Sequence, residues 1–273
     1  MKTASRIYTF FIFLFLYAPI AVLVVFSFNG SETMSRSVWS GFSLRWYRLL
    51  FQDRMLLNSL RNTLVIAVVA AAVSTVLGTA AAIGIGGMNK WARRAVMDIT
   101  NFPMVNPDIV TGVSLMLLFV AAARLLGNRS LGMLSLILAH ITFCLPYVIL
   151  SVMPKLRQMD PNLYEAAQDL GCAPVQAFFK VVLPEILPGV VTGMLMAFTL
   201  SIDDFVISYF TSGTTQTLPI FIYAMTRKRV SPEINALSTL LFGTIFALLM
   251  ILNFRIAGNP GRRGRKAGEG ADQ

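Results

Sequence analysis

Charged residues are scarce in this sequence. Of its 273 residues, 13% are charged and 56% are hydrophobic, and long stretches contain no charge at all. A soluble domain has no core large enough to hide so many apolar side chains, so the composition excludes that class. The sequence instead predicts an all-α, polytopic membrane protein.

Cysteine and histidine are also nearly absent. Cys144 lies in an apolar run and Cys172 in a polar segment, and no CxxC pair occurs, so we predict no disulfide and no metal site. The single histidine, His140, is interpreted as a hydrogen-bonded packing residue. The phosphate-binding pattern G-x-x-x-x-G-K followed by Ser or Thr is missing, so the chain is predicted to be no ATPase, no enzyme, and free of cofactors.

The net charge of +10 raises the question of a nucleic-acid partner. The Lys and Arg residues, however, lie between the apolar runs and in the C-terminal tail. In those places they set membrane topology and meet anionic lipid headgroups. We therefore expect membrane lipid as a partner and no nucleic acid.

Six apolar runs are long enough to cross a membrane as helices. The first is too long for the apolar region of a signal peptide, and no small-residue cleavage site follows it. The third contains Pro103 and Pro107, each of which disfavours helix in the preceding residue, so a broken helix is expected there. The expected spans are residues 7–28, 63–88, 95–123, 131–153, 187–210 and 234–254.

The segments between the spans differ in character. Residues 29–58 are expected to form an external loop, in which residues 43–50 suit a helix at the membrane–water boundary. Residues 211–233 form a second external segment with a short helix that starts at Leu218. Six spans place both termini inside, which the distribution of Lys and Arg slightly favours. The expected division is residues 1–58, first helix and loop; 59–256, core transmembrane domain; and 257–273, a disordered basic tail.

A polar segment, residues 160–188, interrupts the apolar sequence. Asp160 is suited to accept hydrogen bonds from the first turn of a helix over residues 161–170. Gly171 can take the left-handed conformation that ends such a helix. A second helix is expected to begin at Pro174. We call residues 160–188 the coupling module.

Two further features of the coupling module are a pair of prolines in its second helix and an apolar stripe on its first. Pro184 and Pro188 are expected to end the second helix. The first helix has a narrow stripe of Leu163, Ala166, Ala167 and Leu170. This stripe predicts a close-fitting docking contact for another protein.

Three acidic residues lie deep inside the expected spans: Asp108, Asp203 and Asp204. A carboxylate in hydrocarbon costs several kcal/mol unless it is paired or faces water, so these acids are expected to line a cavity. Asp108 and Asp203 are equally far along the chain from the expected membrane entry points Arg94 and Gly189, about 21 Å at ~1.5 Å per residue. With no Lys or Arg inside the spans, the acids favour a cationic ligand.

Structural roles for the same acids remain open. Asp108 can cap the helix that follows it, and Asp203 or Asp204 can bond a hydroxyl such as that of Ser201 or Ser208. Nearby aromatic rings can pack in the core or face an alkylammonium group. Those rings are Phe205, Tyr209 and Tyr147.

The coupling module resembles the EAA signature of the membrane-spanning subunits of binding-protein-dependent ABC importers. The matching residues are Glu165, Ala166, Ala167, Gly171, Leu183 and Pro184, at the spacing of that family. The one departure is Val181, where the family often has Ile. Further segments resemble the permeases of spermidine/putrescine importers: residues 107–109, 140–146, 163–171, 198–204 and 232–238.

The resemblance implies an ABC importer type I permease fold with six spans in a bacterial inner membrane. It implies that the coupling module docks on a dimeric ATP-binding subunit. It also implies a second, homologous permease and a periplasmic polyamine-binding protein as partners. On this reading, Asp108, Asp203, Asp204 and Tyr209 belong to the substrate path.

The leading hypothesis is therefore a polyamine importer permease in which closure of the ATPase dimer rocks the helices that bear the acids. Another small solute carried by the same machinery is one alternative. A channel or secondary carrier that works without ATP is an alternative of a different class. The coupling module discriminates, since a free-standing carrier has no need of it.

Overall fold

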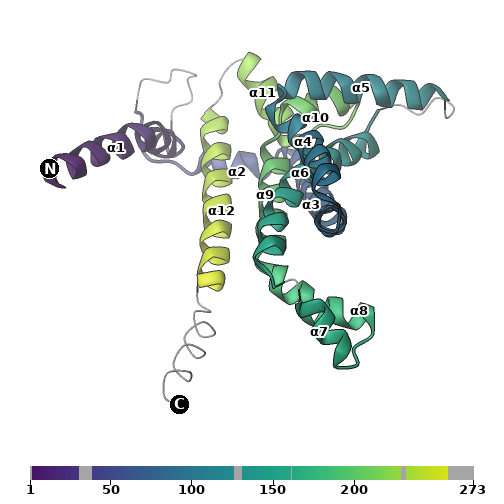
Figure 1. Cartoon of the computed structure of the whole chain (residues 1–273). Helices are drawn as coiled ribbons and strands as arrows, with labels where there is room; N and C mark the ends of the chain where they lie inside the picture. Colours follow the sequence, from purple (N-terminus) through teal and green to yellow (C-terminus); the bar gives the residue numbers. More distant parts are fainter. Residues whose placement is uncertain (1, 31–38, 126–130, 161, 229–231, 258–273) are drawn as a thin grey trace. The chain divides into compact units, whose positions relative to one another are not determined.

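The protein is almost entirely helical (Figure 1). The computed structural model describes residues 2–30, 39–125, 131–160, 162–228 and 232–257. Over these residues the one pairing of extended chain is an isolated bridge between Asn29 and Phe42. The helices are α1 (Lys2–Phe26), α2 (Arg45–Leu50), α3 (Arg54–Gly86), α4 (Lys90–Val105), α5 (Asp108–Leu125), α6 (Met133–Gln158), α7 (Leu163–Asp169), α8 (Pro174–Ala177), α9 (Leu183–Asp203), α10 (Val206–Thr211), α11 (Leu218–Lys228) and α12 (Pro232–Ala257), with a π-helical turn at Phe178–Val182.

Five helices within the described residues are long and apolar enough to cross a membrane. They are Arg6–Phe26, Arg54–Gly86, Asp108–Leu125, Met133–Gln158 of α6, and Pro174–Asp203. The sixth expected span, residues 234–254, lies within the 26 residues of α12. The prediction of an all-α, polytopic membrane protein is confirmed. The expected basic tail from residue 258 onward lies outside the described residues.

The chain divides into two compact units, residues 1–54 with 224–273, and residues 55–223. In the first unit, α12 packs against α1 and α2. The indole Nε1 of Trp46 donates a hydrogen bond of 2.8 Å to the carbonyl of Asn29 and so ties α2 to the end of α1. The helix expected at residues 43–50 is thus confirmed as α2, whereas its position at the membrane boundary stays a prediction.

The second unit is built around the close packing of α6 and α9. A Cβ atom at Gly189 would lie 2.8 Å from the carbonyl oxygen of Ser151, and one at Gly193 would lie 3.1 Å from the Cα of Val148. Small residues in α9 therefore let the two backbones approach each other, as they commonly do between membrane helices. The Ala-rich helix α3 joins this core, because a Cβ at Gly78 would meet the side chain of Val148.

Replacing Gly189 with Ala should destabilise the second unit. The added methyl group would push against the α6 backbone, and overpacking of this kind costs about 1–3 kcal/mol. The measurement is the thermal unfolding midpoint of the purified chain in detergent. Gly84→Ala in α3 is the matched control, because a Cβ at that position meets nothing within 4 Å. Equal midpoints for the two variants would contradict the packing described here.

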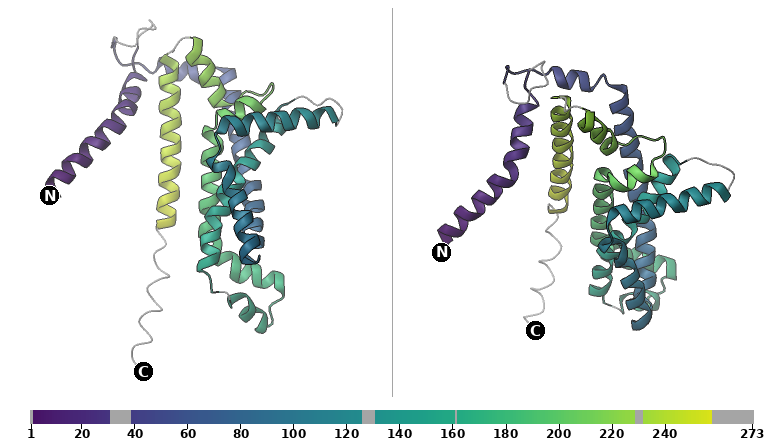
Figure 2. Two further views of the ribbon diagram at one scale, coloured as in Figure 1. Left: turned by 45° about the horizontal axis from the view of Figure 1, so that its top comes forward. Right: turned by 90° about the horizontal axis from the view of Figure 1, so that it is seen from above.

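The third expected span is broken, as predicted, between α4 and α5. Asn106, just before Pro107, has an extended conformation with ψ 137°, as the residue before a proline prefers. Pro103, which was also expected at the break, lies inside α4 instead. The helix also begins at Lys90, earlier than the expected residue 95. Both views in Figure 2 show that α5 crosses the direction of α9.

Two expectations for residues 174–210 are wrong. Pro184 and Pro188 do not end the second helix of the coupling module, since a helix runs from Pro174 to Asp203. The π-helical turn lies just before Pro184: there the N–H of Leu183 donates to the carbonyl of Phe178, five residues earlier. Pro188 lies inside α9. The fifth span is also not continuous, because the chain is extended at Asp204, with ψ 118°, before α10 begins.

Candidate functional site

The two helix breaks of the second unit lie next to each other. Helix α5, which starts at Asp108, packs against α10, which follows the break at Asp204. A Cβ at Gly112, one turn after Asp108, would lie 2.9 Å from the ring of Phe210 and 3.5 Å from the Cα of Ile207. This contact brings together two acid-bearing ends that are far apart in the sequence.

Asp204 is held inside the protein by the start of α10. One of its carboxylate oxygens accepts a hydrogen bond of 3.2 Å from the N–H of Ile207, and the other accepts one of 2.8 Å from the N–H of Ser208. Only 6% of its side chain is exposed. The carboxylate thus satisfies N–H groups that the first turn of a helix leaves without partners. It does not bond the Ser208 hydroxyl, which was one of the alternatives.

His140 joins three helices through a buried polar network. Its Nδ1 atom lies 2.7 Å from Oγ of Ser201 in α9, and its Nε2 atom lies 3.0 Å from Oγ of Ser208 in α10. Nε2 is also 3.6 Å from a carboxylate oxygen of Asp204. His140 is therefore a hydrogen-bonded packing residue, as predicted. Its partners lie 61 and 68 residues away in the sequence, so local sequence patterns could not identify them.

Replacing His140 with Ala should destabilise the helix break at Asp204. The hydroxyls of Ser201 and Ser208 would remain buried without their ring partner, at a cost of about 1–3 kcal/mol for each unsatisfied group. We expect a lower thermal unfolding midpoint and reduced transport. His140→Gln, which keeps a donor and an acceptor, should recover part of both. If His140→Ala unfolded at the wild-type temperature, the network would have no structural role.

Asp108 and Asp203 are placed differently from Asp204, because both side chains are exposed in this chain. Asp203 is the last residue of α9, and Asp108 is the first residue of α5. Among the described residues, the Asp108 side chain makes no hydrogen bond, so the capping alternative is not seen.

An aromatic cluster lies beside Asp203. The ring centroids of Phe205 and Tyr223 are 4.6 Å apart, those of Phe205 and Tyr209 are 5.5 Å apart, and those of Tyr209 and Tyr223 are 6.3 Å apart. Tyr209 and Tyr223 are both exposed. The sequence pointed to Phe205 and Tyr209 but missed Tyr223, which reaches the cluster from α11. Such ring faces attract alkylammonium groups.

The coupling module forms a helical hairpin at the N-terminal end of α9 (Figure 1). The carboxylate of Asp160 accepts a hydrogen bond of 2.9 Å from the N–H of Asn162. Gly171, at φ +87°, ends α7 in the conformation that was predicted. The N–H groups of Gly171 and Cys172 then bond the carbonyls of Gln168 and Ala167, a standard helix-ending motif.

The apolar stripe predicted on α7 is divided between two faces. Ala167 is only 7% exposed and lies where α7 packs against α8 and the π-helical turn. Glu165 and Ala166 are exposed, and so is Leu170, at 87%. Ala167 therefore supports the hairpin from within, because a helix this short must bury part of one face to stay folded.

The remaining signature residues connect the hairpin to the core. Leu183 packs against the buried cluster between α6 and α9, whereas Pro184 is exposed. Val175 and Phe179 add apolar surface to the hairpin, at 67% and 58% exposure. The module thus presents an apolar surface outward while Leu183 anchors it to α9.

Comparison with known protein families decides the membership of the chain. Residues 74–263 match the family described as "Binding-protein-dependent transport system inner membrane component". The chain belongs to this family. The predicted membership in the importer family is therefore confirmed, and this inner membrane component is a multi-pass inner membrane protein.

Relatives of this inner membrane component include named polyamine permeases. The putrescine transport system permease protein PotI of Escherichia coli (strain K12) is 43% identical over 236 residues, which cover 85% of this chain and 83% of PotI. The spermidine/putrescine transport system permease protein PotC of Haemophilus influenzae is 39% identical over 245 residues, which cover 89% of this chain and 93% of PotC.

The fold of this inner membrane component matches solved importer structures. A bacterial ABC transporter involved in the import of the acidic polysaccharide alginate aligns with a TM-score of 0.71, covering 92% of this chain and 95% of that one. A second structure, of an alginate transporter in complex with an alginate-bound periplasmic protein, gives a TM-score of 0.68, covering 92% of this chain and 91% of that one. At 14% and 17% identity, these matches establish the fold alone. The predicted ABC importer permease fold is confirmed.

Proposed function

We propose that this chain is a permease subunit of an ATP-driven importer that moves polyamines such as putrescine and spermidine. The observation that carries the proposal is the pair of exposed carboxylates, Asp108 and Asp203, at adjacent helix breaks beside an aromatic cluster. Discontinuous helices of this kind line binding sites in many transporters. The named relatives, which are putrescine and spermidine/putrescine permeases, support the same substrate class.

The four residues proposed for the substrate path have separate roles. Asp108 and Asp203 attract the ammonium groups, since charges attract more strongly in a membrane cavity than in bulk water. Tyr209 offers a ring face to the alkylammonium chain. Asp204, whose oxygens are already engaged, holds α10 in place and so positions the path.

Energy reaches the path through the coupling module. We propose that the exposed surface around Glu165 and Ala166 docks on a dimeric ATP-binding subunit. Ala167 and Gly171 shape the hairpin, and Leu183 and Pro184 pass its movement to α9. The chain has no ATPase site of its own, so it acts as a transport subunit and not as an enzyme.

The membrane orientation and the partners follow from this docking. The coupling module faces the cytoplasm, and both termini lie on that side. A second homologous permease and a periplasmic polyamine-binding protein complete the importer, with residues 59–256 as its core transmembrane domain.

The test is ATP hydrolysis by the purified complex with its binding protein. Putrescine or spermidine should stimulate hydrolysis, and uptake into vesicles should require ATP. Stimulation by an unrelated solute alone would assign another substrate to the same machinery. Uptake that continues without ATP would instead favour a channel or a secondary carrier.

A further inference from the structure

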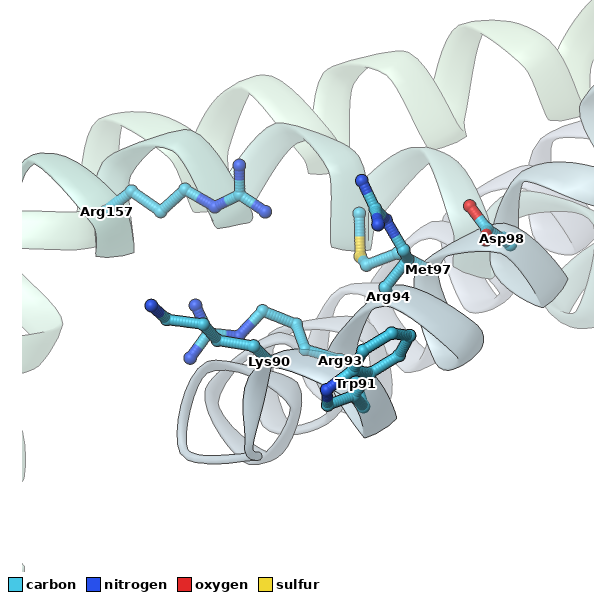
Figure 3. Close-up of a pocket in the computed structure, with 7 residues that line it drawn as sticks. All are labelled: Lys90, Trp91, Arg93, Arg94, Met97, Asp98 and Arg157. Atoms are coloured by element: carbon cyan, nitrogen blue, oxygen red, sulfur yellow. The ribbon is translucent and has the colours of Figure 1, made fainter.

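A basic cavity of about 550 Å³ lies between the first half of α4 and the last turn of α6. Lys90, Arg93 and Arg94 line it from α4, and Arg157 lines it from α6. Figure 3 shows the Arg157 side chain facing the side chains of α4, with Asp98 at the end of the cavity opposite Lys90. Neither the substrate path nor the coupling contact makes use of this cavity.

Within the described residues, the lining of the cavity holds four cations and one carboxylate, that of Asp98. Among the residues that the structure describes, no carboxylate lies at ion-pair distance from Lys90, Arg94 or Arg157. Arg93 uses one terminal nitrogen to donate to the carbonyls of Gly86 and Met88, at 2.8 and 3.0 Å. Its Nε atom is buried without a hydrogen-bond partner.

Four cations gathered around one cavity repel one another, and a buried donor without a partner is costly. An anion with several acceptor oxygens would relieve both costs. Guanidinium groups hold such anions through paired, charge-assisted hydrogen bonds, and phosphate is the anion that fits their planar fork. The cavity therefore has the chemistry of a phosphate-group site.

The position of the cavity in the fold indicates a lipid as the source of the phosphate. The cavity adjoins the ends of two apolar spans, α3 at Gly86 and α6 at Gln158. Trp91, in the lining, is 83% exposed, and tryptophan is enriched at the level of the lipid headgroups. Helix α4 has no buried residue, and its apolar side chain Ile99 is 73% exposed. A lipid can therefore reach the site from the side, with its acyl chains along α4.

We propose that this cavity binds the headgroup of an anionic phospholipid. Lys90, Arg94 and Arg157 contact the phosphate, the Arg93 Nε donates to one of its oxygens, and Trp91 packs at the level of the lipid glycerol. Bound lipid would join the start of α4 to the end of α6. It lies at the membrane end that carries the coupling module, where basic pockets between helices commonly hold anionic headgroups.

Native mass spectrometry of the full chain tests the proposal. The chain is purified with equal amounts of phosphatidylglycerol and phosphatidylcholine, and the lipids that it retains are counted. We expect preferential retention of phosphatidylglycerol. The double variant Arg94→Gln with Arg157→Gln should lower that retention at least tenfold, because it removes two of the four cations that hold the phosphate. Arg124→Gln, an exposed cation at the far end of α5, is the matched control and should change nothing.

Four results would overturn the proposal. The first is equal retention of both lipids by the wild-type chain, and the second is unchanged retention by the double variant. The third is displacement of the lipid by millimolar inorganic phosphate. The fourth is a double variant that keeps its lipid but no longer associates with the ATP-binding subunit. The third would assign the site to free phosphate and the fourth to the partner protein. Thermal unfolding in phosphatidylcholine alone checks that the variants are folded. If the double variant does not fold, the exposed Arg157→Gln substitution is measured by itself.

Discussion

Uptake of spermidine should fall about tenfold or more when Asp203 is replaced by Asn, and similarly for Asp108→Asn. Each change keeps the volume of the side chain and removes one negative charge from the proposed path. A hydrogen bond to a charged group contributes about 1.5–3 kcal/mol, which corresponds to tenfold or more in affinity. Spermidine should lose more than putrescine, because it carries more ammonium groups. Radiolabelled uptake, normalised to inserted protein, is the measurement.

Asp204→Asn should give a different result, because that carboxylate caps α10 with both oxygens. An amide has one acceptor oxygen in place of two, so the thermal unfolding midpoint should fall together with uptake of both polyamines. Glu185→Gln, at an exposed acid in the first turn of α9, is the control for charge loss and should leave the ratio of spermidine to putrescine uptake unchanged. Wild-type uptake of both polyamines by the Asp108 and Asp203 variants would remove these carboxylates from the substrate path.

Replacement of Ala166 with Trp should nearly abolish transport while the protein still inserts into the membrane. Ala166 is exposed, so the larger ring meets no neighbour in this chain and leaves the hairpin folded. A closely fitting docking surface cannot absorb the added volume, and overpacking costs about 1–3 kcal/mol or more. We therefore expect weaker association with the ATP-binding subunit and at least tenfold lower uptake. Co-purification and vesicle uptake are the two measurements.

The Ala167→Trp variant should also lose transport, but for a different reason. Ala167 is buried inside the hairpin, so its replacement should unfold the coupling module itself and lower its protection from proteolysis. Gln158→Trp, at an exposed position in the last turn of α6, is the control for a bulky ring near the module. Full association and full uptake by the Ala166 variant would show that this face does not dock.

Local sequence chemistry was enough to predict several elements. The apolar runs predicted membrane helices, because a backbone in lipid must satisfy its own hydrogen bonds. Pro107 predicted the break before Asp108, since a proline restrains the residue that precedes it. Gly171 predicted the end of α7, where its φ of +87° suits a residue without a side chain. Each of these effects acts over a few neighbouring residues.

Contacts between distant segments decided the rest. No proline or glycine next to Asp204 predicts the helix break there. The break depends on the Asp204 carboxylate, which caps α10 beside His140 of α6. Continuity through Pro184 depends on the π-helical turn, whereas the inward position of Ala167 depends on α7 packing against α8. The sequence alone determined which residues carry charge or turn the chain. Only the tertiary structure decided which of two adjacent acids is buried and which is exposed, because burial depends on the helices that pack around each one.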